Sequence, residues 1–232
     1  RDHPPVIKEL IILAASRKYG KFCVAGIDTR TGQWLRLVTT DSDAHYAIDT
    51  TDLIMDNGAQ AAKLDIVSLE ITDRSPSYFQ SENYVIHKRS PWHYCGRASI
   101  PDVTAIHPPN RSEFIFYDTS RRLTRDFYRG LKPSEVQSLL LISPDSAQVE
   151  ILEKEAKRRV LLHLHYRQRD YEPLPVTDLE FCARCETLAL GLYPMRKHGI
   201  MLCSVGECYE KDQYHYKLVA GIMLENGVNS EA

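Results

Sequence analysis

The chain has 232 residues, of which 43% are hydrophobic and 26% charged, and its formal net charge is −2. This length allows one large domain or two barrels of about 100 residues each, and the composition excludes a disordered chain. The near-neutral charge argues against a generic polyanion binder, so any nucleic-acid site must be a local patch.

No apolar run approaches the roughly 18 residues that a membrane-spanning helix needs. The amino-terminal residues 1–5 contain no apolar signal region. We therefore expect a cytoplasmic protein without a membrane partner, with its six cysteines reduced.

The first half of the chain is predicted to be built from strands. Residues 10–14 form a short, partly β-branched apolar run that is typical of a buried strand. Residues 22–27 and 34–38 flank a polar, glycine-containing loop and indicate a β-hairpin. With a further strand over residues 64–72, about five strands can close into a small barrel.

The second strand of that hairpin carries the first candidate binding residues. Strand periodicity places Leu35 and Leu37 on one face, and Trp34 and Arg36 on the other. We expect the face with Trp34 and Arg36 to point outward.

A short helix is predicted between Asp118, which can cap it, and Gly130, which can end it. Its exposed face would carry Arg121, Arg125 and Arg129 at a spacing of four residues. This stripe can follow a nucleic-acid backbone, although surface helices often carry such charges for solubility alone.

The second half returns to strands. Residues 160–166 alternate apolar and polar side chains, and residues 217–224 read as a final buried strand. Between them, Asp178 is predicted to cap a helix that continues to about Leu190.

The turn-forming residues 143–145 give the only plausible hinge beyond the middle of the chain. We place the domain boundary near residues 135–145. This gives a first barrel with a helical extension over residues 1–138, and a second barrel over residues 139–232.

Four cysteines have a spacing that can hold a tetrahedral zinc ion, namely Cys182, Cys185, Cys203 and Cys208. The first pair falls in the predicted helix, whereas zinc-binding pairs normally lie on tight turns. We favour buried thiols and assign no metal ligand.

No motif for catalysis or for a nucleotide cofactor is present. The chain lacks the glycine-rich phosphate-binding patterns, and no local signature marks a nucleophile. Cys95 is close to His93 in the sequence, but nothing constrains the two, and we favour an ordinary surface or core thiol. We therefore expect a binding protein and not an enzyme, with no catalytic residue and no cofactor.

Aromatic and cationic residues on the predicted strands are the remaining candidates, because rings stack on bases and cations meet phosphates. They are Arg17, Lys18, Trp34, Arg36, Tyr214, Tyr216 and Lys217. The alternative is a solvated strand face with ordinary cross-strand pairs.

Ten short segments, in a fixed order from about residue 9 to residue 224, share a family pattern. They are residues 14–18, 23–26, 34–38, 64–67, 80–84, 91–92, 138–142, 174–178, 204–207 and 214–220. Together they resemble the dual OB-containing domain family, prokaryotic proteins in which two oligonucleotide/oligosaccharide-binding barrels are fused. Cys208, where the family usually has proline, and the extra Cys182 and Cys185 depart from that pattern.

The resemblance implies two barrels and a nucleic-acid-binding role. It also implies polar residues, not required by a hydrophobic core, that are the first to test as ligand contacts. They are Ser16, Arg17, Gln80, Glu82, Asn83, Thr177, Asp178 and Lys217. For Asp178, we favour the role of a helix cap.

The sequence therefore predicts a mainly β protein made of two fused OB-like small β-barrels with a few short helices. We expect a non-catalytic module that binds single-stranded or structured RNA or DNA through a local patch. The alternative is a protein-interaction or sensor subunit that docks a partner enzyme.

Overall fold

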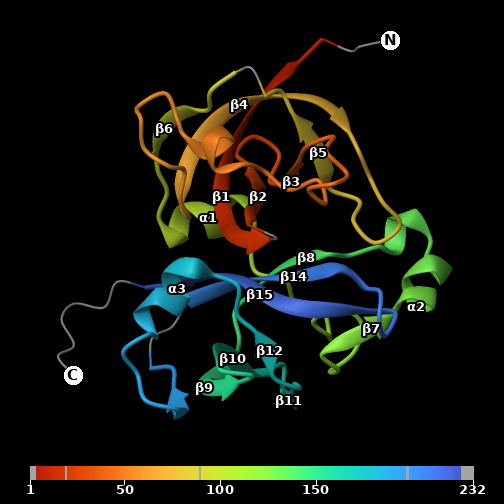
Figure 1. Ribbon diagram of the computed structural model, residues 1–232, viewed down its shortest axis with the longest axis vertical. Helices are drawn as coiled ribbons and strands as arrows, with labels where there is room; N and C mark the ends of the chain where they lie inside the picture. Colours follow the sequence, from red (N-terminus) through yellow and green to blue (C-terminus); the bar gives the residue numbers. More distant parts are fainter. Residues whose placement is uncertain (1–3, 19, 89, 197–198, 226–232) are drawn as a thin grey trace. The chain divides into compact units, whose positions relative to one another are not determined.

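The computed structural model describes residues 4–18, 20–88, 90–196 and 199–225. The chain divides into two compact units (Figure 1). Unit 1 comprises Arg1–Pro108 and Tyr128–Gln137, and unit 2 comprises Pro109–Phe127 and Ser138–Ala232. Both are mainly β, as the sequence predicts.

Unit 1 is a closed barrel of five strands. The strands, with a sixth that extends the sheet, are β1 (Val6–Lys18), β2 (Lys21–Asp28), β3 (Trp34–Val38), β4 (Asp65–Arg74), β5 (Asn83–Ile86) and β6 (His93–Arg97). Their order is β1-β2-β3-β5-β4-β6, and pairing of β1 with β4 closes the barrel. β3 and β5 pair in parallel, and the other pairs are antiparallel. This is the architecture of an OB barrel.

The barrel interior is filled by apolar side chains that alternate along its strands. Leu35 and Leu37 of β3 belong to this core together with Trp92, which is 1% exposed. Where β1 and β2 cross, a Cβ atom on Gly26 would lie 2.1 Å from the carbonyl oxygen of Ile11. Only glycine allows this close approach of the two backbones.

Short helices complete unit 1: η1 (Thr50–Leu53), α1 (Ile100–Ile106) and η2 (Pro133–Glu135). α1 begins with a capping box, in which the Ser99 hydroxyl accepts from the Asp102 amide and the Asp102 carboxylate accepts from the Ser99 amide. Among the described residues, no helix is long and apolar enough to cross a membrane.

Unit 2 contains two sheets. One has the order β11-β10-β9-β13, with β12 also paired to β10, and the other has the order β7-β15-β14-β8. Their strands are β7 (Arg122–Thr124), β8 (Leu139–Ile142), β9 (Ser146–Lys154), β10 (Lys157–Tyr166), β11 (Arg169–Asp170), β12 (Leu174–Pro175), β13 (Gly191–Pro194), β14 (Gly199–Tyr209) and β15 (Tyr214–Leu224).

The predicted helix between Asp118 and Gly130 is mostly wrong. Residues 122–124 form β7, which pairs with Tyr214–Tyr216 of β15, and only α2 (Arg125–Gly130) is helical. Pairing with a distant strand overrides the local spacing of Leu123 and Phe127, so the three arginines do not share one helix face.

The predicted helix after Asp178 is correct at its start and too long at its end. The Asp178 carboxylate accepts a hydrogen bond from the Phe181 amide and caps α3 (Leu179–Arg184). Cys185 caps the helix at its other end. Gly191 then begins β13, which pairs with β9.

The predicted boundary at residue 138 and the two units differ in one segment. Residues 109–127, which the sequence assigns to the first barrel, lie in unit 2. The reason is that β7, in this segment, pairs with β15.

Candidate nucleic-acid interface

The β4–β5 hairpin of unit 1 presents an arginine beside a tyrosine at its stem. Arg74 and Tyr84 are register partners, and the guanidinium of Arg74 lies 5.7 Å from the centroid of the Tyr84 ring. A hydrogen bond of 3.0 Å from Arg74 Nη2 to the Ser81 carbonyl fixes the guanidinium. Tyr84 also packs against the barrel core. The exposed Arg74 guanidinium therefore contacts a ring whose position the core fixes.

The tip of the same hairpin presents a second pair. The backbones of Ser77 and Gln80 hydrogen-bond to each other across the turn. Phe79 is 8% exposed and anchors the tip, whereas Tyr78 is 38% exposed. The guanidinium of Arg129 lies 5.4 Å from the centroid of the Tyr78 ring. The hairpin therefore carries two cation–π pairs.

Arg36 lies on the strand face opposite the core leucines, as predicted, but the expectation that it is exposed is wrong. It is 8% exposed, and its Nη2 and Nε lie 3.2 and 3.4 Å from Glu82 Oε1. Burying a guanidinium requires such a partner. Arg36 and Glu82 thus join β3 to the end of the hairpin loop, and the pair serves to position that loop.

Gln80 and Asn83 lie beside this ion pair. Asn83 is 7% exposed, and its side-chain amide donates to Gln80 Oε1 at 3.3 Å. Its carbonyl oxygen Oδ1 is buried and has no hydrogen-bond partner in the described part of the chain. The structure therefore brings together four residues that the sequence singled out from distant segments: Arg36, Gln80, Glu82 and Asn83.

Trp34 is partly buried and not freely presented. Its ring lies 4.5 Å from the His107 ring, at an interplanar angle of 57°. His107 Nδ1 donates to the Gly32 carbonyl at 2.7 Å, which fixes the imidazole against the hairpin. Arg17 is exposed near the end of β1, whereas the Lys18 side chain lies outside the described residues.

In unit 2, Tyr214 and Tyr216 pack around one arginine. The guanidinium of Arg122 lies 4.0 Å from the centroid of the Tyr214 ring and donates to the Tyr216 hydroxyl at 3.1 Å. It also pairs with Asp212 at 3.4 Å. The hydrogen bond from Tyr216 lowers the pKa of Asp212. This carboxylate offsets the charge of Arg122, so the cluster offers a phosphate little attraction.

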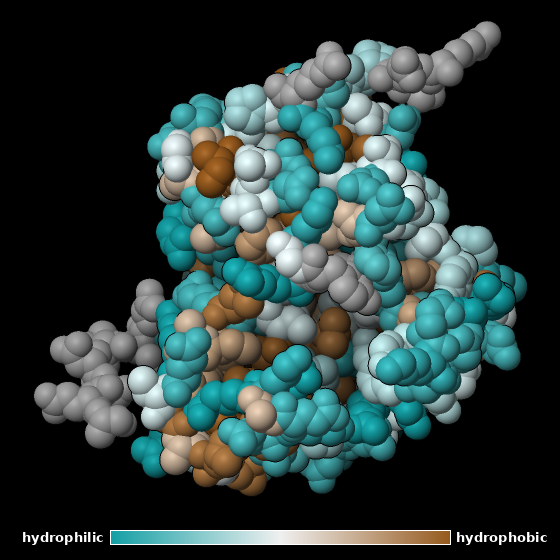
Figure 2. All heavy atoms as spheres, viewed as in Figure 1, coloured by the Kyte–Doolittle hydropathy of each residue, from teal (hydrophilic) through white to brown (hydrophobic). Residues whose placement is uncertain are grey.

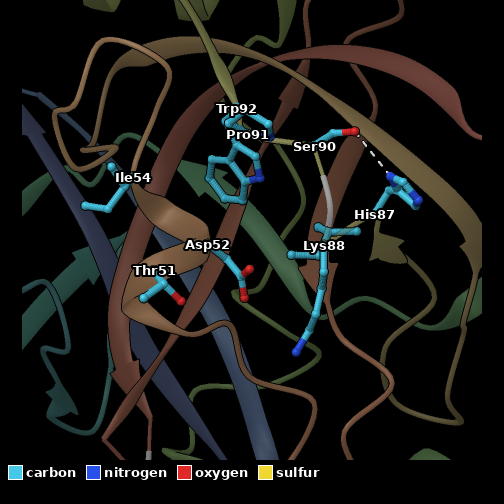
Figure 3. Close-up of a pocket in the computed structure, with 9 residues that line it drawn as sticks. Thr51, Asp52, Ile54, His87, Lys88, Ser90, Pro91 and Trp92 are labelled. Atoms are coloured by element: carbon cyan, nitrogen blue, oxygen red, sulfur yellow. Dashed lines mark hydrogen bonds between the residues drawn. The ribbon is translucent and has the colours of Figure 1, made fainter.

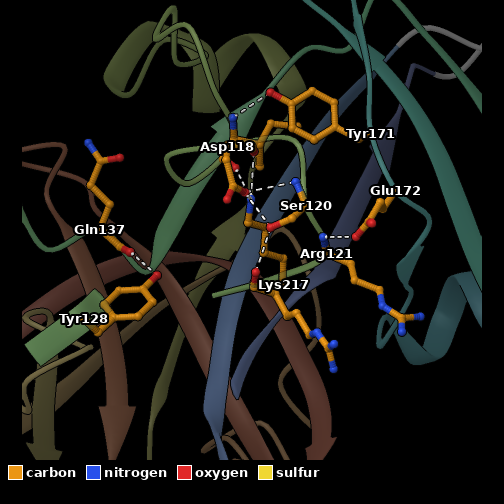
Figure 4. Close-up of polar contacts among 10 residues, drawn as sticks. Asp118, Ser120, Arg121, Tyr128, Gln137, Tyr171, Glu172 and Lys217 are labelled. Carbon is orange, nitrogen blue, oxygen red and sulfur yellow. Dashed lines mark hydrogen bonds and ion pairs between the residues drawn. The ribbon is translucent and has the colours of Figure 1, made fainter. Parts of the chain in front are cut away.

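Lys217 is internal, so the expectation that it faces a ligand is wrong. Its side chain is fully buried, and Nζ donates to the Ile115 and Asp118 carbonyls and to Asp118 Oδ1, at 2.8–2.9 Å (Figure 4). These three hydrogen bonds use every ammonium proton. Lys217 therefore organises the loop before β7.

The pKa values of the two partners shift for different reasons. Burial lowers the pKa of Lys217 against the opposing effect of Asp118. Burial also acts to raise the pKa of Asp118, but the hydrogen bonds from Lys217 and Ser120 outweigh it and leave this pKa below its usual value. The difference follows from exposure, because the Asp118 side chain is 48% exposed and loses less hydration.

Residues 8–222 match the family model of the dual OB-containing domain. The chain belongs to this family. No curated protein matches it. The p204 HINb domain is similar in structure, with 8% identity and a TM-score of 0.35 over 94% of this chain and 97% of that one. The tetrameric p202 HIN2 domain has 9% identity and a TM-score of 0.29 over 94% and 92%.

The cysteines of this dual OB protein are free thiols, of which Cys185 and Cys203 are buried and Cys95 is exposed. Cys203 is fully buried in β14, and burial raises its pKa to about 12. Burial likewise raises the pKa of Cys182, on α3, to about 11. Within residues 4–18, 20–88, 90–196 and 199–225, no three histidine, cysteine or acidic side chains form a cluster suited to a metal ion.

Sequence reasoning missed Arg74, Tyr78 and Arg129 as members of one surface of the dual OB protein. Tyr78 had a local signal, because it follows Pro76 in a polar stretch between two strands, where exposed rings are unusual. Arg129 had none that points to the hairpin, since it reaches Tyr78 from a segment 51 residues later in the chain.

Proposed function

We propose that this dual OB protein binds single-stranded nucleic acid through the β4–β5 hairpin of unit 1, without bond chemistry. The observation that carries the proposal is the pair of arginine–tyrosine contacts on this hairpin, Arg74 with Tyr84 and Arg129 with Tyr78. In OB barrels, the connection between the fourth and fifth strands is one of the loops that contact oligonucleotides.

Tyr78 and the two arginines supply complementary parts of such a site. The exposed tyrosine ring can stack on a base of any identity, because every base has a π-face. The guanidinium groups then meet the phosphates on either side of that base. In the described part of the chain, no carboxylate pairs with Arg74 or Arg129, so both keep their full charge for a phosphate.

The buried polar residues below the hairpin support this surface and do not form it. The Arg36–Glu82 ion pair fixes the end of the hairpin loop against β3. A binding side chain held by such contacts loses less conformational entropy when a ligand arrives. We therefore expect substitutions of Arg36 to lower affinity only indirectly, by releasing the hairpin loop from β3.

The test is fluorescence anisotropy with labelled oligo(dT) and oligo(U), and with duplexes of the same length, at several salt concentrations. We expect Tyr78→Ala to weaken single-strand binding by about 1–3 kcal/mol, the cost of one lost stacking contact. Arg74→Ala should lower the slope of log affinity against log salt by about 0.7, the value for one phosphate contact on a single strand.

Matched controls come from other surfaces of unit 1. Tyr46 is 48% exposed, but it lies in residues 41–56, which contain five aspartates and no lysine or arginine. Arg30 is exposed at the β2–β3 turn. Tyr46→Ala and Arg30→Ala should leave affinity unchanged. Equal losses in the hairpin and control variants would overturn the site, and no binding at low salt would overturn the function.

A second candidate function, protein docking, is favoured by β13 in unit 2. This strand pairs only with β9 among the described residues, and Leu190 and Leu192 beside its open edge are 58% and 52% exposed. Figure 2 shows hydrophobic side chains at the surface of this unit. An open edge with exposed leucines can add an extended strand from a protein partner. If the protein bound no oligonucleotide, protein docking would become the favoured function.

A further inference from the structure

Unit 1 contains a pocket of about 190 Å³ that the proposed nucleic-acid surface does not use. It lies between η1 and the segment after β5, residues 87–88 and 90–92 (Figure 3). Its apolar lining includes Ile54, Ile86 and Trp92. The Asp56 amide donates to the Trp92 carbonyl at 2.8 Å, which ties the chain after η1 to the end of this segment.

Two opposite charges stand on facing sides of this pocket. Figure 3 shows the Asp52 carboxylate on the side of η1 and the Lys88 side chain on the other, with the Trp92 ring above them. The two groups do not pair with each other, and neither forms a side-chain hydrogen bond or ion pair with another described residue. Each charge therefore has capacity for a ligand group of opposite sign.

The wall that carries Lys88 is held from behind by a hydrogen-bonded network. Ser90 Oγ donates to Glu70 Oε2 at 2.7 Å, and His87 Nδ1 lies 3.1 Å from the same oxygen. His87 Nδ1 and Ser90 Oγ are 3.2 Å apart. Because Glu70 lies on β4, the barrel fixes both residues that flank Lys88 in the pocket lining, and the site is largely preformed.

Size and charge together define the ligand. A cavity of about 150 Å³ holds a molecule of the size of benzene, so this pocket suits one small molecule and excludes dinucleotides. The Asp52 carboxylate on one side of the lining disfavours a phosphate. The opposed Asp52 and Lys88 instead match a zwitterion.

We propose that this pocket binds a free aliphatic α-amino acid. Its ammonium group pairs with Asp52, its carboxylate with Lys88, and its side chain packs against Ile54, which is 39% exposed. Trp92 is 1% exposed and offers almost no ring surface, which favours an aliphatic over an aromatic side chain. This inference is independent of nucleic-acid binding.

The test is isothermal titration calorimetry of the full chain with L-leucine and two single-charge analogues. 3-Methylbutylamine lacks the carboxylate, and 4-methylpentanoate lacks the ammonium group. We expect one leucine site and about tenfold or greater losses of affinity for each analogue, because each leaves one charged group unpaired. Cytidine and guanosine 5′-monophosphate test whether the pocket instead takes a nucleotide.

Variants locate the site. Asp52→Asn and Lys88→Gln keep side-chain size and should each weaken leucine binding about tenfold or more. Asp43→Asn, on the same acidic segment, and Lys154→Gln, at the end of β9, are matched controls that should leave it unchanged. Thermal unfolding without ligand checks that all four fold.

Several results would overturn the proposal: no leucine binding at millimolar concentration, leucine binding insensitive to both pocket variants, or equal affinity for leucine and its analogues. Preferred binding of a mononucleotide that Asp52→Asn abolishes would overturn it in favour of a nucleotide pocket. The comparison of leucine with its analogues uses the unaltered chain, so it stands even if a variant misfolds.

Discussion

Lys217→Met separates a structural from a ligand-binding role for the most buried cation of unit 2. Methionine keeps the length and apolar stem of the side chain and removes the ammonium group. If Lys217 organises the loop before β7, the variant loses stability in unit 2. If Lys217 is a ligand contact, the variant loses affinity and keeps its stability.

The magnitude follows from the partners that are left behind. The Ile115 and Asp118 carbonyls lose their donor, and an unsatisfied buried acceptor costs about 1–3 kcal/mol. The variant also avoids the cost of burying the ammonium group, which offsets part of this loss. The Asp118 carboxylate is half exposed and keeps its hydrogen bond from Ser120. Water can therefore replace the lost ammonium group at this carboxylate with little cost in free energy. We expect Lys217→Met to lower the free energy of unfolding by about 3 kcal/mol. This is the lower end of the cost of removing one partner of a buried ion pair.

Urea unfolding followed by two signals measures this loss. Both tryptophans, Trp34 and Trp92, lie in unit 1, so tryptophan fluorescence reports on that unit, whereas far-ultraviolet circular dichroism reports on both. We expect the variant to lower the midpoint of the circular-dichroism transition. Lys154→Met, at an exposed position, should change stability by less than about 0.5 kcal/mol. A loss below about 1 kcal/mol in Lys217→Met would refute the structural role, because it is smaller than one unsatisfied acceptor.

Two further predictions concern titrating groups. Hydrogen bonds hold the pKa values of Asp28 and Asp118 below the usual value for aspartate, against the opposing effect of burial. The stabilisation from these two carboxylates is therefore present above the pKa of an unfolded aspartate and is lost as the pH falls through the folded-state values. The melting temperature should therefore drop below about pH 4, and less steeply in Lys217→Met; an unchanged slope in the variant would contradict the coupling. At about pH 8, Cys182 and Cys203 should react slowly with Ellman's reagent, because burial raises their pKa values. The exposed Cys95 should react faster than these two because the reagent reaches it, although burial also raises its pKa. Extra thiols released by a chelator would show that Cys182 and Cys203 bind metal.

The sequence predicts a structural feature well where residues close together in the chain determine it. In β3, the alternation that places Leu35 and Leu37 in the core is a property of five consecutive residues. The capping role of Asp178 is equally local, since its partner is the Phe181 amide three residues later. Such features need no knowledge of the remaining chain.

Burial of the polar candidates could not be predicted in the same way. Arg36 pairs with Glu82, which is 46 residues away, and Lys217 pairs with Asp118, which is 99 residues away. The alternation of side chains along a strand predicts which face a side chain lies on. It does not predict whether a carboxylate from a distant segment packs against that face. The sequence alone therefore predicts exposed cations on these strands, although Arg36 and Lys217 are buried and structural.

The pairing of cations with carboxylates also separates the β4–β5 hairpin of unit 1 from the arginine–tyrosine cluster of unit 2. In unit 2, Arg122 pairs with Asp212 and Arg125 with Glu210, so each guanidinium has a carboxylate within 3.4 Å. A phosphate that approaches must compete with these carboxylates, and little counterion release remains to drive binding. The guanidinium groups of Arg74 and Arg129 in unit 1 lie instead against neutral tyrosine rings, which fix their position without cancelling their charge. For a chain with a net charge of −2, this local difference in pairing favours the β4–β5 hairpin of unit 1 over the Arg122 cluster of unit 2 as the proposed site.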